Sequence, residues 1–109
     1  MHYWHNDISI ADVGNIQCGA ALGDSYAAAK TVIGELLQMA KTVIIIGGSH
    51  DNTMAQYYAY KDLNKIIEAT VIDSNIDLKS KSQVRNQNFL MEMIKHEPKL
   101  IKHYNNLGF

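Results

Sequence analysis

Five consecutive residues with β-branched side chains, Thr42-Val43-Ile44-Ile45-Ile46, end abruptly at Gly47-Gly48. A continuous apolar run of this length is typical of a strand that is covered on both faces. A parallel sheet with helices on each side supplies that cover. The run therefore predicts an α/β fold in which three layers, α/β/α, enclose a mostly parallel sheet.

The remaining elements alternate along the chain. The second helix is expected to turn Tyr58 inward together with Met54. No repeat or linker interrupts the pattern, so residues 1–109 are expected to form a single α/β domain. Apolar patterning predicts strands at residues 8–13, 42–46, 66–73 and 100–109, and three- and four-residue spacing predicts helices at 24–41, 52–64 and 86–96.

Composition excludes several classes of partner. Ten basic residues face eleven acidic ones, so the chain lacks the positive surplus that nucleic-acid binding requires. No apolar run approaches the roughly 18 residues that would suggest a membrane span. The single cysteine, Cys18, cannot form an internal disulfide, which fits a reducing compartment. We therefore expect a cytoplasmic protein without nucleic-acid or membrane partners.

Polar residues follow three of the predicted strands, at residues 12–15, 47–52 and 73–77. Ligands of open parallel sheets collect beyond the carboxyl ends of the strands, so these places are the candidate sites. The glycine pair is compatible with a tight turn in which Ser49, Asp51 or Asn52 caps the next helix. The same turn would also place the His50 imidazole where it could bind a metal ion. A phosphate loop, and with it a nucleotide-binding domain, is a weaker alternative, because its further glycine and its lysine are missing.

The segment 73–77 offers a second group of possible ligands. If the chain stays extended there, Asp73, Asn75 and Asp77 project to the same side. Two carboxylates and an amide oxygen would suit a hard divalent ion such as Mn²⁺ or Mg²⁺. An ordinary turn rich in Asp and Asn is the alternative.

These segments together resemble the ureohydrolase family of arginase, agmatinase and formimidoylglutamase. Members of that family carry Gly-Gly-Asp-His-Ser after one apolar strand and Asp-Ala-His-x-Asp after the next. Residues 12–15 resemble the upstream Asp-x-Gly-Asn/Asp turn, and residues 103–109 are similar to a strand of formimidoylglutamase-like sequences. The two matching motifs read Gly47-Gly48-Ser49-His50-Asp51 and Asp73-Ser74-Asn75-Ile76-Asp77.

The resemblance implies metal-assisted hydrolysis of a C–N bond in a guanidino or formimino compound, on two manganese ions that hold a hydroxide. It assigns His50, Asp73 and Asp77 as ligands of the first metal. The second metal keeps only Asp73, because Asn75 stands where the family has a histidine, and amide oxygen is a poor ligand for a transition metal. The resemblance therefore implies a degenerate metal motif.

We accordingly expect a fragment of a longer arginase-like domain that holds manganese at one partial site at most. No residue is assigned a catalytic role, and the chain is expected not to hydrolyse arginine. A full-length relative would take a small guanidino or formimino compound. The alternative is a non-catalytic α/β folding or association module, in which His50, Asp73 and Asp77 form hydrogen-bonded turns. A truncated sheet leaves apolar surface uncovered, so a homo-oligomer is expected in either case.

Overall fold

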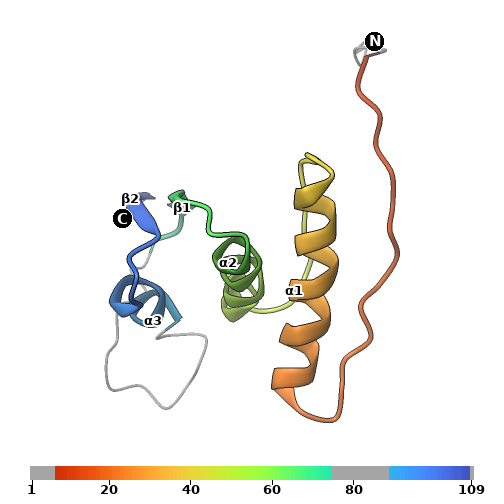
Figure 1. The fold of residues 1–109 in the computed structure, drawn as a ribbon, viewed down its shortest axis with the longest axis horizontal. Helices are drawn as coiled ribbons and strands as arrows, with labels where there is room; N and C mark the ends of the chain where they lie inside the picture. The colour runs from red at the N-terminus through yellow and green to blue at the C-terminus, as the bar shows by residue number, and fades with distance from the viewer. Residues whose placement is uncertain (1–6, 75–88, 109) are drawn as a thin grey trace.

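The computed structural model describes residues 7–74 and 89–108, in which two helices precede a strand–helix–strand unit. Figure 1 shows the elements in chain order, with the two strands and α3 at one end of the molecule and α1 beyond α2. In sequence they are α1 (Leu22–Gln38), a 3-10 helix η1 (His50–Asn52), α2 (Thr53–Asp62), β1 (Ile67–Ile72), α3 (Phe89–Lys95) and β2 (Ile101–Leu107).

Helix α1 confirms the first predicted helix and begins slightly earlier than the sequence suggested. Ala21 is the N-cap residue, and its N–H donates to the Asp24 carboxylate at 3.1 Å. The Ser25 hydroxyl accepts from the Gly19 N–H, also at 3.1 Å. Asp24 and Ser25 thus satisfy backbone donors from inside the first turn. This is why the helix extends past them toward the N-terminus.

The two strands form a parallel sheet connected through α3. Residues pair from Ile67 with Ile101 to Ile72 with Leu107, with one irregularity between Ile67 and Glu68. Parallel strands need a crossover connection, and α3 lies within it. The α/β class, the parallel sheet and the predicted strands at 66–73 and 100–109 are therefore confirmed.

The core lies between the sheet and the helices α2 and α3. Tyr57, and not Tyr58, is the buried tyrosine of α2, while Tyr58 is half-buried at the edge of the cluster. Along β1, half-buried and exposed residues alternate, so helices cover one face of the described sheet. The buried cluster consists of Met54, Tyr57, Phe89, Leu90, Met93 and Leu100, with Tyr58, Ile67, Ile101 and Tyr104 packed against it.

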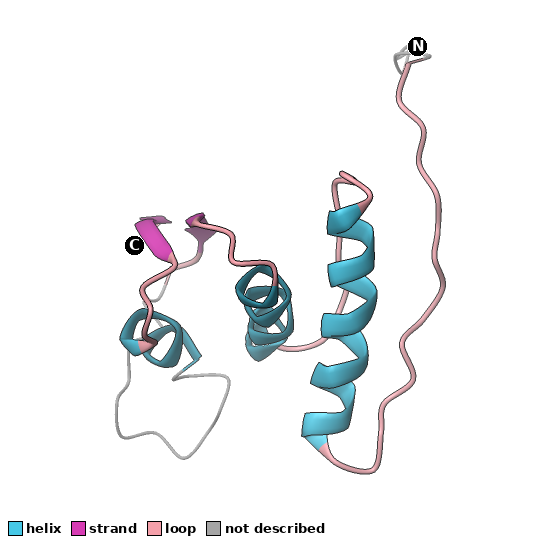
Figure 2. Cartoon of the chain, in the orientation of Figure 1, coloured by secondary structure: helices cyan, strands magenta, loops and turns pink. Residues whose placement is uncertain are grey.

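Two predicted strands are wrong. Residues 8–13 and 42–46 belong to no strand and to no helix. Figure 2 shows both as parts of long loops that flank α1. Ile10 is 83% exposed and Ile46 is 93% exposed, so neither segment is buried beneath helices as its apolar composition suggested. The physical reason is that a strand requires a hydrogen-bonding partner, and the described residues pair β1 only with β2.

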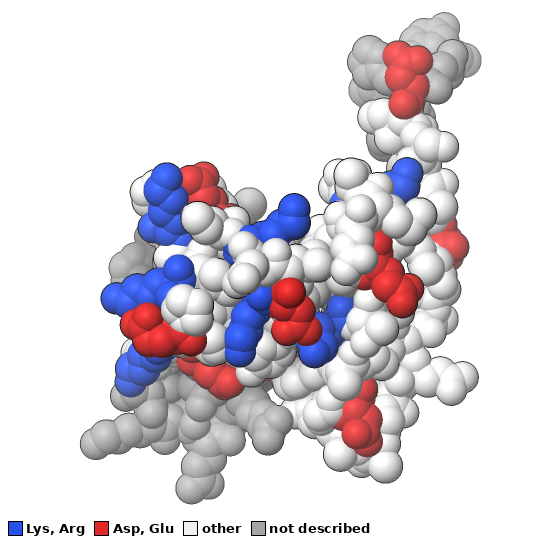
Figure 3. Space-filling model, in the orientation of Figure 1, with Lys and Arg blue, Asp and Glu red and all other residues white. Residues whose placement is uncertain are grey.

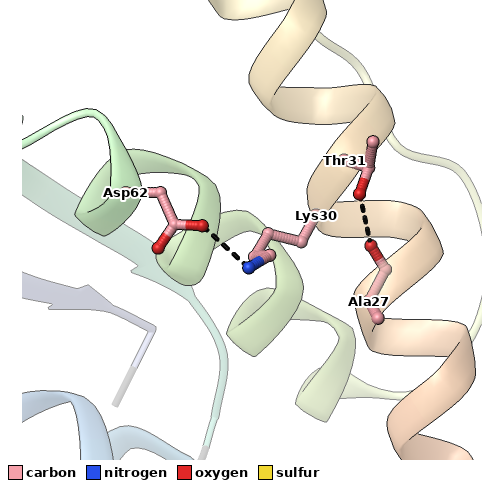
Figure 4. A network of polar contacts seen from close by, with 4 residues as sticks. All are labelled: Ala27, Lys30, Thr31 and Asp62. Atoms are coloured by element: carbon pink, nitrogen blue, oxygen red, sulfur yellow. Dashed lines mark hydrogen bonds and ion pairs between the residues drawn. The ribbon is translucent and has the colours of Figure 1, made fainter.

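Helices α1 and α2 pack across one another, and Figure 1 shows α1 from the side while α2 is seen nearly along its axis. Lys30 of α1 forms an ion pair with Asp62 at the end of α2, with Nζ and Oδ2 2.7 Å apart. Figure 4 shows this pair beside the Thr31 hydroxyl, which donates to the Ala27 carbonyl one turn earlier at 2.9 Å. Both Lys30 and Asp62 are substantially exposed, so their pairing contributes little stability.

Charged side chains of both signs are mixed over the face of the molecule seen in Figure 3. Along the segment that precedes α1, at the right of that view, most of the described surface belongs to residues other than Lys, Arg, Asp and Glu. Among the described helices, none has the length and apolar character that crossing a membrane demands.

Candidate functional site

The turn that carries His50 depends on two glycines. Gly47 has φ +96° and Gly48 has φ +80°, a backbone region that other L residues rarely adopt. A Cβ atom at Gly48 would lie 1.6 Å from Nδ2 of Asn52, so a side chain there would also collide. The Asn52 N–H donates to the Ser49 carbonyl at 3.0 Å and closes the turn. The glycine pair therefore sets where η1 begins and where His50 lies.

Asp73 reaches the same place from the sheet. It directly follows β1, and its N–H donates to the Leu107 carbonyl at 3.0 Å, which holds it at the carboxyl edge of both strands. His50 Nδ1 lies 3.4 Å from Asp73 Oδ2. The side chain of Asp73 is 17% exposed and that of His50 is 60% exposed. The structure thus brings together His50 and Asp73, which are 23 positions apart in the numbered sequence.

The third predicted ligand, Asp77, lies outside the described residues, and so does Asn75. Within residues 7–74 and 89–108, no group of three or more His, Cys, Asp or Glu side chains could hold a metal ion. His50 and Asp73 are therefore the two candidate ligands that the structure places. The role of Asp77 stays a prediction.

The segment around Asp12 is not brought to this edge of the sheet. The Gly14 N–H donates to the Asp12 carboxylate at 2.8 Å, and Gly14 has φ +89°, so a local turn does form. Figure 1 shows this N-terminal segment running apart from the strands, on the far side of α1. The expected position at a strand end was wrong because residues 8–13 form no strand.

Asp51 is buried, which its place in the sequence did not predict. The sequence offers Ser49, Asp51 or Asn52 as the cap of the next helix, yet neither η1 nor α2 has a side-chain cap hydrogen bond. Asp51 is instead buried, 5% exposed, and accepts hydrogen bonds from the Tyr26 and Ser49 hydroxyls. One signal for this was present in the sequence: the chain reads Ser-His-Asp where the resembled family has Asp-His-Ser.

Comparison with known proteins now decides the family. The sequence profile described as the arginase family matches residues 1–106, almost the whole chain. The chain belongs to the arginase family. Comparisons with curated proteins and with solved structures give no match.

Proteins of the arginase family generally depend on metal, and the donor atoms at this edge of the sheet have a spacing that bears on metal binding. Two ligand atoms that each lie about 2.1 Å from a metal ion are about 3.0 Å apart in octahedral geometry and about 3.4 Å apart in tetrahedral geometry. The 3.4 Å between His50 Nδ1 and Asp73 Oδ2 agrees with that spacing. It is also longer than an ordinary N–H···O hydrogen bond. The chemistry and spacing of this pair fit one side of a metal site.

Proposed function

We propose that this chain is an arginase-family protein that binds a single manganese ion at a partial site and does not hydrolyse a guanidino substrate. The approach of His50 to Asp73 at the carboxyl edge of the sheet is the observation that supports the metal site. His50 would contribute an imidazole nitrogen, Asp73 a carboxylate, and Asp77 a second carboxylate. A bound ion would supply Lewis-acid activation of water, the chemistry by which such enzymes cleave C–N bonds.

The proposed lack of activity rests on Asn75. In the family motif this position carries a histidine ligand of the second metal, and an amide oxygen binds transition metals weakly. With one ion held, the activation of water by two metals together that the resemblance implies would be missing. We therefore expect no turnover of arginine, agmatine or formimidoylglutamate. A steady-state assay that found enzymatic rates with manganese present would contradict the proposed inactivity.

The metal site is tested by titrating the purified chain with Mn²⁺ alone and following free ion by electron paramagnetic resonance. We expect the His50→Ala, Asp73→Asn and Asp77→Ala variants each to bind more than about tenfold more weakly than the wild type, since each loses a direct ligand. His103→Ala is the matched control. His103 is also a histidine with a 60% exposed side chain, but it pairs with Glu68 on the sheet. Equal binding by the wild type and the three ligand variants would remove the site.

A second candidate function is an association module without catalysis. The observation that favours it is the exposed apolar surface of residues 8–13 and 42–46, where Ile8 is 68% and Ile44 is 76% exposed. Surfaces of this kind mark contacts between chains or between parts of a longer chain. This candidate is compatible with a metal-free His50 and Asp73, so the Mn²⁺ titration separates it from the first.

A further inference from the structure

Asp51 is the buried charged residue of the described chain, and it lies next to a candidate metal ligand. A carboxylate removed from water is unfavourable unless hydrogen bonds compensate for the lost hydration. Here the Tyr26 hydroxyl donates to Oδ2 and the Ser49 hydroxyl donates to Oδ1. Both oxygens are therefore engaged, and hydrogen bonds to a charged acceptor are among the stronger ones in proteins.

The three residues come from two parts of the fold, helix α1 and the turn that begins η1. Tyr26 lies on α1, Ser49 follows the glycine pair, and Asp51 lies in η1, which leads into α2. His50 stands between Ser49 and Asp51, so both of its neighbours are held through one carboxylate. The His50 side chain is itself 60% exposed, so much of the imidazole surface faces water. The backbone of the turn, which these hydrogen bonds hold, contributes to the direction of the side chain.

We propose that Asp51 is a positioning residue: with Tyr26 and Ser49 it holds the turn so that the His50 imidazole faces Asp73. This inference rests on the proposed function for the role of His50 as a metal ligand. It extends that function by naming the residue that prepares the site. In the resembled family motif the carboxylate precedes the histidine, and here the carboxylate follows it. The chain has thus exchanged the acidic and hydroxyl residues on either side of His50.

A polar contact between α1 and α2 provides the control. Lys30 on α1 pairs with Asp62 on α2. Their side chains are 37% and 55% exposed, and Asp62 is at the opposite end of α2 from His50. Figure 4 shows that this pair lies between the two helices, with neither partner belonging to the His50 turn. Asp62→Asn therefore removes a helix-to-helix carboxylate contact without touching the turn.

The test is made on the metal-free chain by NMR, with the imidazole signal of His50 assigned through its loss in His50→Ala. Asp73→Asn should shift this signal in the wild-type background, because the two side chains lie 3.4 Å apart. We expect the shift caused by Asp73→Asn to fall at least about twofold in an Asp51→Asn background. In an Asp62→Asn background it should be unchanged. A full response in the Asp51→Asn background would overturn the proposal.

Hydrogen exchange supplies a second readout and guards against a variant that fails to fold. Tyr26→Phe and Ser49→Ala each remove one donor and leave the carboxylate in place. Each should speed amide exchange across residues 47–53 by at least about tenfold, and Asp62→Asn should not. Unchanged exchange in both donor variants would refute the role of the carboxylate.

Titration with Mn²⁺ alone then connects positioning to the metal. Asp51→Asn should weaken Mn²⁺ binding at least about tenfold relative to the wild type and to Asp62→Asn. If the wild-type chain binds no Mn²⁺, the proposed metal function fails, whereas the metal-free NMR response still decides whether Asp51 positions His50. If Mn²⁺ binds equally to the wild type and to Asp51→Asn, the positioning role is wrong and the metal function stands.

Discussion

Tyr57 places a polar hydroxyl group in the hydrophobic core. Its side chain is 2% exposed, and its ring meets the edge of the His96 ring with centroids 5.9 Å apart. The buried hydroxyl has no hydrogen-bond partner among the described residues. Burial also raises the pKa of Tyr57 above its ordinary value of 10.0, because the charged phenolate is poorly solvated there. The aromatic ring is therefore the favourable part of this side chain, and the hydroxyl is unfavourable.

The first prediction follows from that hydroxyl. Tyr57→Phe should leave the free energy of unfolding unchanged or raise it by up to about 1 kcal/mol, because an unsatisfied buried group is removed. Tyr58→Phe is the matched comparison and should lower it by a few tenths of a kcal/mol, roughly, because the Tyr58 hydroxyl donates to Glu92 at 2.9 Å. Urea denaturation measures both. A loss above about 1 kcal/mol in Tyr57→Phe would show that the hydroxyl has a partner after all.

The raised pKa of Tyr57 also predicts how stability changes at high pH. The unfolded chain ionises this tyrosine near its ordinary value of 10.0, whereas the folded chain resists ionisation. The unfolded state thus holds fewer protons above that pH, so folding stability falls as the pH rises. Between about pH 9 and about pH 11 the wild type should lose more stability than Tyr57→Phe. Equal losses in the two proteins, measured by urea denaturation at each pH, would contradict this assignment.

At the scale of the element, α1 and α2 end in the same way. After α1, the Ala40 N–H donates to the Leu37 carbonyl and the Lys41 N–H donates to the Leu36 carbonyl. After α2, Asn64 and Lys65 make the equivalent pair of bonds. The residue that turns the chain has φ +54° at Ala40 and φ +53° at Asn64. Asparagine tolerates this left-handed conformation, and alanine is strained in it.

The two helix ends therefore predict opposite effects of related substitutions. Ala40→Gly should stabilise the chain by about 1 kcal/mol, because glycine adopts a positive φ without strain. Asn64→Ala should destabilise it by about the same amount, since it introduces the strain that Ala40 already carries. Thermal unfolding followed by circular dichroism measures both variants. Stabilisation by Asn64→Ala, or destabilisation by Ala40→Gly, would show that the backbone conformation does not control these ends.

At the scale of the whole molecule, the described chain leaves much apolar surface in contact with water. The segments 8–13 and 42–46 contribute Ile10 and Ile46, which are 83% and 93% exposed. The outer face of the sheet adds Ile72 at 83% and Leu107 at 53% exposure. Extended apolar segments with unpaired backbone groups readily pair with another chain. The arrangement of the whole molecule thus favours association.

We therefore predict that the chain self-associates and that residues 42–46 contribute to the contact. Light scattering over a range of concentrations should show a mass above 12.2 kDa that rises with concentration. The double variant Ile44→Lys and Ile46→Lys should shift the chain toward the monomer. Thr42→Lys, which adds charge in the same exposed segment without removing an isoleucine, should shift it less. A wild-type chain that stays monomeric at high concentration would sink this prediction.

Sequence alone determined the features that depend on near neighbours or on a general rule of sheets. The helices follow from apolar spacing because each backbone hydrogen bond in a helix closes within four residues. The proximity of His50 and Asp73 was predicted from the rule that residues after parallel strands share one edge. The proximity is confirmed but the reason is not, because residues 42–46 form no strand. Only the tertiary structure decided that β1 pairs with β2, that Tyr57 lies in the core, and that Asp51 is buried and accepts a hydrogen bond from Tyr26. A strand pairing or a buried hydrogen bond can join residues at any separation in the chain. The pattern of residues within a short segment does not show which distant residue will be the partner.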